Sequence, residues 1–169
     1  NVMIVSVIGL GYIGLPTAAL LASQGIQVVG VDVNKSVVDT VNRGAVHIVE
    51  PELSILVKNA VSEGNLCAKI VPVKADVFIV SVPTPFKEGF EPDLSYIESA
   101  AKSISAVLEK ENLVILESTS PVGTTEKMMK IMQKERSDLI FPVPGVDESL
   151  IDIHLAHCPE RVLPGKVVH

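Results

Sequence analysis

One feature of the sequence restricts the possible folds more than any other: a glycine-rich turn that connects an apolar run to a helical segment. Residues 2–8 are almost entirely apolar, and residues 9–14 read GLGYIG, which matches the pattern GxGxxG. There Gly9 allows a tight turn, Gly11 lets a phosphate group approach the backbone, and Gly14 lets the helix pack closely on the strand. The pattern predicts a pyrophosphate site at the start of the helix, the alternative being a glycine-rich turn that binds nothing.

The remaining chain alternates short apolar runs with helical segments, a pattern typical of βαβ units and a parallel sheet. Strands are expected at residues 2–8, 27–31, 67–71, 77–82, 113–117 and 154–157, and helices at residues 13–23, 35–42 and 51–62. A fourth helix, capped by Asp93 or Ser95, is expected to reach about residue 109, and a fifth to run from Thr124 or Thr125 to about residue 135. Residues 138–152 hold two prolines and a glycine without a clear period, so we expect a loop there. The chain is therefore predicted to be α/β, a Rossmann-type doubly wound parallel sheet with helices on both faces, formed as one domain over residues 1–169.

Composition narrows the possible partners. Hydrophobic residues make up 47% of the chain, and Trp is absent, as expected of strands buried on both faces of a parallel sheet. The net charge of −6 argues against nucleic acid as a partner. Cys67 and Cys158 are far apart and the four histidines lack ligand spacing, so neither a disulfide framework nor a metal site is indicated, and a cytoplasmic location is expected. No apolar stretch is long enough to span a membrane, which predicts a soluble protein.

Asp32 strengthens the interpretation of the glycine pattern, because it ends the second expected strand 18 residues after Gly14. A carboxylate at that place can accept hydrogen bonds from the adenosine ribose, and it would repel the 2'-phosphate of NADP. The predicted cofactor is therefore NAD, although Lys35 nearby could soften the discrimination. The alternative is a turn aspartate that caps the next helix, a role that Asn34 could also fill.

Hydroxyl groups gather where the fourth and fifth expected strands end. Thr84 lies between two prolines after the fourth strand, Thr119 follows the fifth strand, and Thr125 stands at the start of the next helix. Ligands of open α/β sheets bind outside the carboxyl ends of the strands, so these hydroxyls could contact the nicotinamide ribose or orient a water molecule. They could equally be capping and turn residues only.

The last segment, CPERVLPG at residues 158–165, places Glu160 and Arg161 beyond the final strand. A carboxylate at that place can hold a water molecule or take a proton, and Arg161 could hold an anionic or polyhydroxyl substrate. An exposed charged turn is the alternative. For Cys158 we expect a buried, unreactive thiol, since the sequence around it does not reveal the pKa of that thiol.

Five segments, GLGYIGLPTA, VDVN, SVPTPF, ESTSPVGTT and CPERVLPG, in this order and spacing, resemble the UDP-glucose/GDP-mannose dehydrogenase family over essentially the whole chain. Members of that family oxidise the C6 alcohol of a nucleotide sugar to a carboxylate and pass two hydrides to two NAD molecules. The resemblance implies that this chain is the NAD-binding domain, without the central helical and C-terminal nucleotide-sugar domains. It also implies that the chain alone is inactive, because the catalytic cysteine and lysine are missing, and that the parent enzyme is a homo-oligomer.

The resemblance also implies roles for individual residues. Tyr12 and Ile13 would line the phosphate loop and Asp32 would take the adenosine ribose. The nicotinamide end would be bordered by Thr84, Thr119 and Thr125. Glu160 would act at the reacting carbon, as the catalytic residue that manages the water or proton. The sugar side would be lined by Arg161, Val162 and Leu163.

The substrate expectation depends on one departure from the family pattern. Members that act on UDP-glucose carry a second glutamate where this chain has Pro164. Together with the forms HIVEP and CPERVLPGK, this difference favours UDP-N-acetyl-D-mannosamine, oxidised to its uronic acid in two NAD-dependent steps. UDP-glucose and GDP-mannose are the alternative substrates. A different dehydrogenase of the same fold, or a non-catalytic NAD-sensing module, are the alternative functions.

Overall fold

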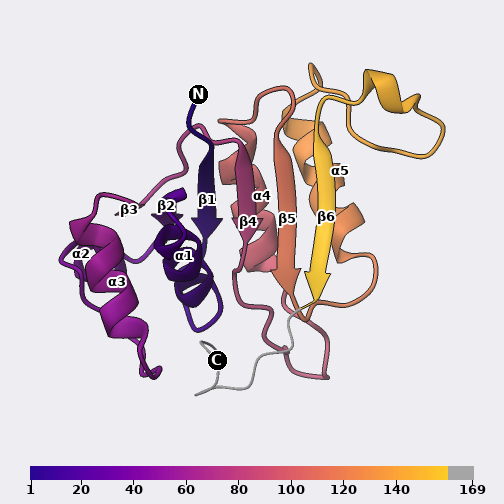
Figure 1. Cartoon of the computed structure of the whole chain (residues 1–169). Helices are drawn as coiled ribbons and strands as arrows, with labels where there is room; N and C mark the ends of the chain where they lie inside the picture. The colour runs from indigo at the N-terminus through magenta and orange to yellow at the C-terminus, as the bar shows by residue number, and fades with distance from the viewer. Residues whose placement is uncertain (160–169) are drawn as a thin grey trace.

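The computed structural model describes residues 1–159 and shows a single six-stranded sheet in which every pairing between neighbouring strands is parallel (Figure 1). The strands stand in the order β3-β2-β1-β4-β5-β6, so the direction of winding reverses between β1 and β4. Their bounds are β1 (Ile4–Ile8), β2 (Gln27–Val31), β3 (Leu66–Lys69), β4 (Val77–Val80), β5 (Leu113–Ser118) and β6 (His154–Pro159). This order confirms the predicted doubly wound Rossmann-type sheet, in which the reversal point is the place for a ligand.

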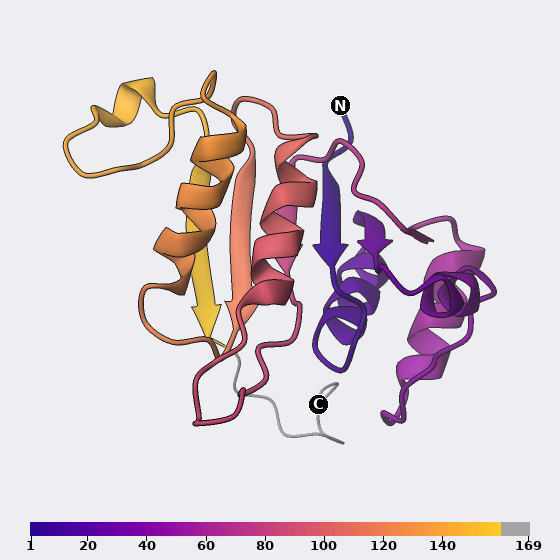
Figure 2. The same cartoon turned by 180° about the vertical axis from the view of Figure 1, so that it is seen from behind.

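Helices cover both faces of the sheet, as predicted. Their bounds are α1 (Gly14–Ser23), α2 (Lys35–Asn42), α3 (Leu53–Ser62), α4 (Ser95–Ser105) and α5 (Thr124–Glu135). One apolar cluster packs α1 and α3 against β1 and β2 and includes Val7, Leu15 and Leu53. A second packs α4 and α5 against β4 and β5 on the opposite face, which Figure 2 shows, and includes Phe78 and Met128. Each face of the sheet therefore has its own core.

Several element ends differ from the expectation by one to a few residues, and two of the differences have a local reason. The third helix begins at Leu53 rather than at Pro51, because Glu52 has a φ of 64° and cannot continue a right-handed helix. Strand β4 ends at Val80 because Pro83 follows closely and lacks the N–H group that a strand pairing needs. The segment expected to be loop, residues 138–152, contains one short 3-10 helix at Glu148–Leu150.

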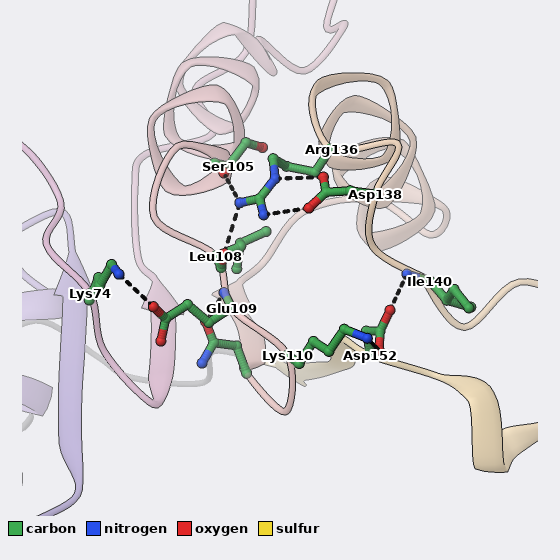
Figure 3. Close-up of polar contacts among 10 residues, drawn as sticks. Lys74, Ser105, Leu108, Glu109, Lys110, Arg136, Asp138, Ile140 and Asp152 are labelled. Atoms are coloured by element: carbon green, nitrogen blue, oxygen red, sulfur yellow. Dashed lines mark hydrogen bonds and ion pairs between the residues drawn. The ribbon is translucent and has the colours of Figure 1, made fainter.

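Helix α4 ends at Ser105, four residues before the expected end, and Arg136 supplies a donor to the carbonyls there (Figure 3). Its Nη1 group donates to the carbonyl oxygens of Ser105 at 3.0 Å and Leu108 at 2.8 Å. Its Nε and Nη2 groups donate to the two carboxylate oxygens of Asp138, each at 2.9 Å. This bidentate bond lowers the pKa of Asp138 and raises the pKa of Arg136. Arg136 thus joins the carboxyl ends of α4 and α5.

The loop between α5 and β6 projects from the amino-terminal end of the sheet, away from the carboxyl ends of the strands (Figure 1). Asp152, which is buried, fastens its base by accepting the backbone N–H of Ile140 at 2.8 Å (Figure 3). Its other carboxylate oxygen lies 3.5 Å from Nζ of Lys110. The hydrogen bond between Ile140 and Asp152 therefore joins the two ends of this loop, at the end of the sheet opposite to the glycine-rich turn.

Candidate functional site

A cavity of about 800 Å³ lies at the carboxyl ends of the central strands, at the point where the strand order reverses. Three parts of the chain that the sequence analysis singled out border it: the glycine-rich turn, Asp32 and the exit of β4. Its full lining is Ile8, Gly9, Leu10, Gly11, Tyr12, Ile13, Val31, Asp32, Val33, Asn34, Val37, Ile70, Pro72, Ser81, Val82, Pro83, Ser95, Tyr96, Ser99, Ala100 and Ser103. A volume of this size lies within the range of small-molecule sites.

The three glycines of the turn have different surroundings. A Cβ atom on Gly9 would lie 2.8 Å from the carbonyl oxygen of Ser81, and one on Gly14 would lie 1.7 Å from the carbonyl oxygen of Gly9. A Cβ on Gly11 would meet no atom within 4 Å. The protein itself therefore requires the first and third glycines, whereas the space at Gly11 is open and can receive a group that approaches the backbone, as a pyrophosphate does.

Helix α1 presents its amino-terminal end to the cavity. Ile13 occupies the N-cap position, makes no side-chain capping bond, and lines the cavity together with half-exposed Tyr12. The first turn of α1 carries no acidic residue. The first backbone N–H groups of a helix lack acceptors within the helix and carry a partial positive charge, so the end of α1 suits an anionic group.

Asp32 is half-buried and tied to the glycine-rich turn. Its Oδ2 accepts the backbone N–H of Leu10 at 3.0 Å, and its Oδ1 accepts the backbone N–H of Asn34 at 2.9 Å. The capping of α2 is done by Asn34, whose side chain accepts the N–H of Ser36 at 3.0 Å. A carboxylate can accept about four hydrogen bonds, so Asp32 is held in place and retains capacity for the two hydroxyls of a ribose.

The three threonines lie at the same end of the sheet but outside the cavity wall. Thr84 directly follows the lining residue Pro83, Thr119 follows β5 and is exposed, and Thr125 lies in the first turn of α5. The bonds that fix the turn between β5 and α5 come from their neighbours. Ser118 Oγ accepts the N–H of Ser120 at 3.0 Å, and Thr124 Oγ1 donates to the carbonyl of Pro121 at 2.7 Å.

The predicted substrate-side residues, Glu160, Arg161, Val162 and Leu163, lie outside the described residues. The expectation of a buried thiol at Cys158 is wrong, because both cysteines are exposed. Cys158 lies on β6, which is an edge strand. It pairs with Glu117 of β5, so its side chain points to the same face of the sheet as that of Glu117. Helices α1 and α3 cover this face over β1 and β2, but not over β6. Burial of an edge strand depends on topology, which the local sequence does not contain.

One wall of the cavity is formed by α4, and it was not predicted from the sequence. Tyr96, Ser99, Ala100 and Ser103 follow the spacing of three and four residues that places side chains on one helical face. Three of these four side chains are small, which leaves room beside the helix. That repeat of small residues was the available signal. The apolar residues Ile70 and Pro72, which follow β3, were also missed.

Other parts of the described chain offer weaker sites. Within residues 1–159, no three His, Cys, Asp or Glu side chains lie close enough together to hold a metal ion. A shallow cavity of about 360 Å³ at the opposite end of the sheet is lined in part by Lys74, Glu109 and Arg136. Arg136 is hydrogen-bonded within the protein there, and none of the predicted site residues among residues 1–159 lines this cavity. Among the helices of residues 1–159, none is long and apolar enough to cross a membrane.

Comparisons with known proteins agree with this geometry. A UDP-N-acetyl-D-mannosamine dehydrogenase of Campylobacter jejuni is 61% identical over 165 residues, which are 97% of this chain and 40% of that protein. An NDP-N-acetyl-D-galactosaminuronic acid dehydrogenase of Ralstonia nicotianae is 56% identical over 97% of this chain and 38% of its own length. This chain thus spans about two fifths of the length of these curated relatives.

Solved structures show the same fold. A UDP-D-ManNAc dehydrogenase from Pyrococcus horikoshii superposes with a TM-score of 0.85 at 42% identity, covering 98% of this chain and 38% of that chain. The sequence profile of the NAD-binding domain of the UDP-glucose/GDP-mannose dehydrogenase family matches residues 3–169. The glycine-rich turn, the cavity beside it and this match over nearly the whole sequence lead to one conclusion: the chain is an NAD-binding domain and belongs to the UDP-glucose/GDP-mannose dehydrogenase family.

Proposed function

We propose that this chain is the NAD-binding part of a nucleotide-sugar 6-dehydrogenase that oxidises UDP-N-acetyl-D-mannosamine to its uronic acid in two NAD-dependent steps. The observation that carries the proposal is the shared cavity, which brings the open space at Gly11 and the carboxylate of Asp32 onto one surface. The similarity to a UDP-N-acetyl-D-mannosamine dehydrogenase at 61% identity supports the choice of sugar. The match to about two fifths of that protein supports the view that this chain alone does not complete the reaction.

The cavity suggests how the cofactor lies. The pyrophosphate would sit against Gly11 and the start of α1, with Tyr12 and Ile13 beside it, and Asp32 would accept the hydroxyls of the adenosine ribose. The adenine would occupy the apolar part near Ile70. The nicotinamide end would lie toward the exits of β4 and β5, where Thr84, Thr119 and Thr125 stand. NAD, when bound, supplies the acceptor for hydride.

Outside the described residues, we propose that Glu160 manages the water or proton at the reacting carbon. The sugar would be contacted by Arg161, Val162 and Leu163. These assignments continue the order of the chain, because β6 ends at Pro159 beside Ser118 of β5, at the carboxyl edge where the nicotinamide end would lie. The site of hydride transfer would therefore form between the exits of β4, β5 and β6.

Replacing Asp32 by alanine is expected to weaken NAD binding about tenfold, since hydrogen bonds to a charged group contribute about 1.5–3 kcal/mol. The preference for NAD over NADP should shrink as well, because the repulsion of the 2'-phosphate is lost. Calorimetric titration of both cofactors measures both effects. Glu63→Ala is the matched control, because Glu63 is an exposed carboxylate at the end of α3 that does not line the cavity. Equal NAD affinity for the wild type and the Asp32 variant would contradict the assignment.

The choice of sugar is tested with a chimera in which residues 1–169 replace the matching part of the Campylobacter jejuni relative. We expect NADH formation, followed at 340 nm, with UDP-N-acetyl-D-mannosamine and at least tenfold slower formation with UDP-glucose, GDP-mannose or a UDP-N-acetylgalactosamine substrate. The unmodified relative is the control for the donated segments. A chimera that binds NAD and accepts none of these sugars would contradict the proposed reaction, and one that prefers another sugar would contradict the proposed substrate.

A further inference from the structure

Glu117 has no role in the assignments above, yet it connects three elements beside the cofactor cavity. It is the penultimate residue of β5, and its Oε1 accepts the hydroxyl of Thr17 on α1 at 2.8 Å. The same oxygen lies 3.4 Å from the hydroxyl of Ser81, which directly follows β4. The side chain is half-buried on the face of the sheet where Ile115 packs against the core around α1. One carboxylate thus joins α1, β4 and β5.

Ser81 passes this connection on to the cavity wall. It is buried, lines the cavity, and donates its backbone N–H to the carbonyl of Ile8 at 2.8 Å. Its carbonyl oxygen lies against Gly9, and its Cβ would lie 3.2 Å from a Cβ on Gly14. Glu117 and Thr17 do not line the cavity themselves. The carboxylate therefore stands behind the wall, at the seam where the glycine-rich turn meets the exit of β4.

That seam separates the two ends of the cofactor. Asp32 directly follows β2, in the half of the sheet formed by β1, β2 and β3. With the adenosine ribose at Asp32, the adenosine lies over this half of the sheet. The nicotinamide end must then extend across the reversal point toward β4 and β5. The distance between the start of α1 and the exits of β4 and β5 thus decides whether the pyrophosphate and the nicotinamide are accommodated together. Glu117 is bonded to a residue on each side of that gap.

We infer that Glu117 is a positioning residue for the nicotinamide end of NAD, acting through Thr17 and Ser81 by holding α1 against the exits of β4 and β5. The inference rests on the proposed cofactor site and deepens it. A bond that only stabilised the fold would support every part of the cofactor equally. A bond at this seam supports the nicotinamide end more than the adenosine end, because the turn and Asp32 hold the adenosine end without it.

The test compares two ligands that differ at the nicotinamide end alone. NAD and ADP-ribose share the adenosine and the pyrophosphate, and ADP-ribose lacks the nicotinamide ring. For Glu117→Ala we expect the Kd for NAD to rise about tenfold and the Kd for ADP-ribose to change less than about twofold. Glu117→Gln keeps an acceptor oxygen for Thr17 and should restore NAD binding to within about threefold of the wild type.

Two further variants separate the connection from a general effect. Thr17→Val removes the donor and should raise the Kd for NAD in the same direction, whereas the double variant with Glu117→Ala should be no weaker than Glu117→Ala alone. Glu135→Ala, an exposed carboxylate on α5, is the control for the loss of one negative charge. Circular dichroism and thermal unfolding of each variant show whether it is folded.

Each outcome has a distinct meaning. A selective loss of NAD affinity with rescue by glutamine supports the positioning role. Equal losses for NAD and ADP-ribose, or no loss for either, overturn it while leaving the cofactor site standing. If Glu117→Ala does not fold, Thr17→Val with the same two ligands decides between these results. Failure of the wild-type chain to bind both ligands would instead contradict the proposed function.

Discussion

Replacing Gly14 by alanine is expected to abolish NAD binding and to lower the free energy of unfolding by about 3 kcal/mol. The added Cβ would lie 1.7 Å from the carbonyl oxygen of Gly9, far inside any permissible contact, and the obstacle is backbone that cannot rotate away. Either α1 must move off the sheet or the turn must open, and both changes displace the pyrophosphate site. Chemical denaturation measures the loss of stability, and calorimetry measures the loss of NAD binding.

Gly11→Ala is the matched control, because the same added methyl group meets no protein atom within 4 Å. The free energy of unfolding of this variant should lie within about 0.5 kcal/mol of the wild-type value, as is usual for a substitution that contacts no neighbouring atom. It should still bind NAD at least tenfold more weakly, since the methyl group occupies the space into which the pyrophosphate approaches. Unchanged NAD affinity in Gly11→Ala would show that the pyrophosphate lies elsewhere, whatever Gly14→Ala does.

Replacing Arg136 by alanine is expected to lower the free energy of unfolding by about 2–3 kcal/mol without changing the Kd for NAD. The variant leaves the carbonyls of Ser105 and Leu108 without the donor that joins them to the end of α5. It also removes the bidentate partner of Asp138. The cofactor cavity lies at the opposite end of the sheet, so the loss should appear in denaturation curves only.

Arg136→Lys tests whether geometry or charge is responsible. A lysine retains the charge but presents a single ammonium group in place of the planar fork, so it cannot reproduce the bonds to both carbonyls and to Asp138 together. We expect it to recover less than half of the lost stability. Lys134→Ala, which removes an exposed positive charge from the last turn of the same helix, should change stability by less than about 0.5 kcal/mol. Full recovery in Arg136→Lys would contradict the role of the fork.

Local patterns in the sequence were sufficient to predict the architecture. Runs rich in Val and Ile indicated the strands. Gly25, Gly44 and Gly64, all with positive φ, lie just after α1, α2 and α3, the helices that they were expected to terminate. The pattern GLGYIG predicted the turn between β1 and α1 that borders the cavity, because its meaning depends on a strand before it and a helix after it, both of which are local. Asp32, at the end of the neighbouring strand, lines the same cavity and could be singled out for the same reason. The binding of a phosphate and a ribose at these residues stays a prediction.

What the sequence could not show depends on contacts between distant residues. The carbonyl at the early end of α4 accepts a hydrogen bond from Arg136, which lies 31 residues after Ser105. The α4 wall of the cavity belongs to a helix that begins more than 80 residues after the glycine-rich turn. Glu117 reads as an ordinary polar residue near a strand end, and only the fold brings it to Thr17. A local pattern cannot contain such pairs, because strand order decides which segments meet.

The hydrogen bond between Thr17 and Glu117 spans 100 residues of sequence, and this separation sets the order in which the binding site can be assembled during synthesis. The glycine-rich turn, Asp32 and the apolar residues after β3 all lie between residues 9 and 72, and so are made before the segments that follow them. The α4 wall and Glu117 leave the ribosome only later. Closing so long a loop also costs more entropy than pairing β1 with β2. The bond that joins α1 to β5 can therefore form only after the fifth strand has been made and has joined the sheet, later than the local contacts of the glycine-rich turn.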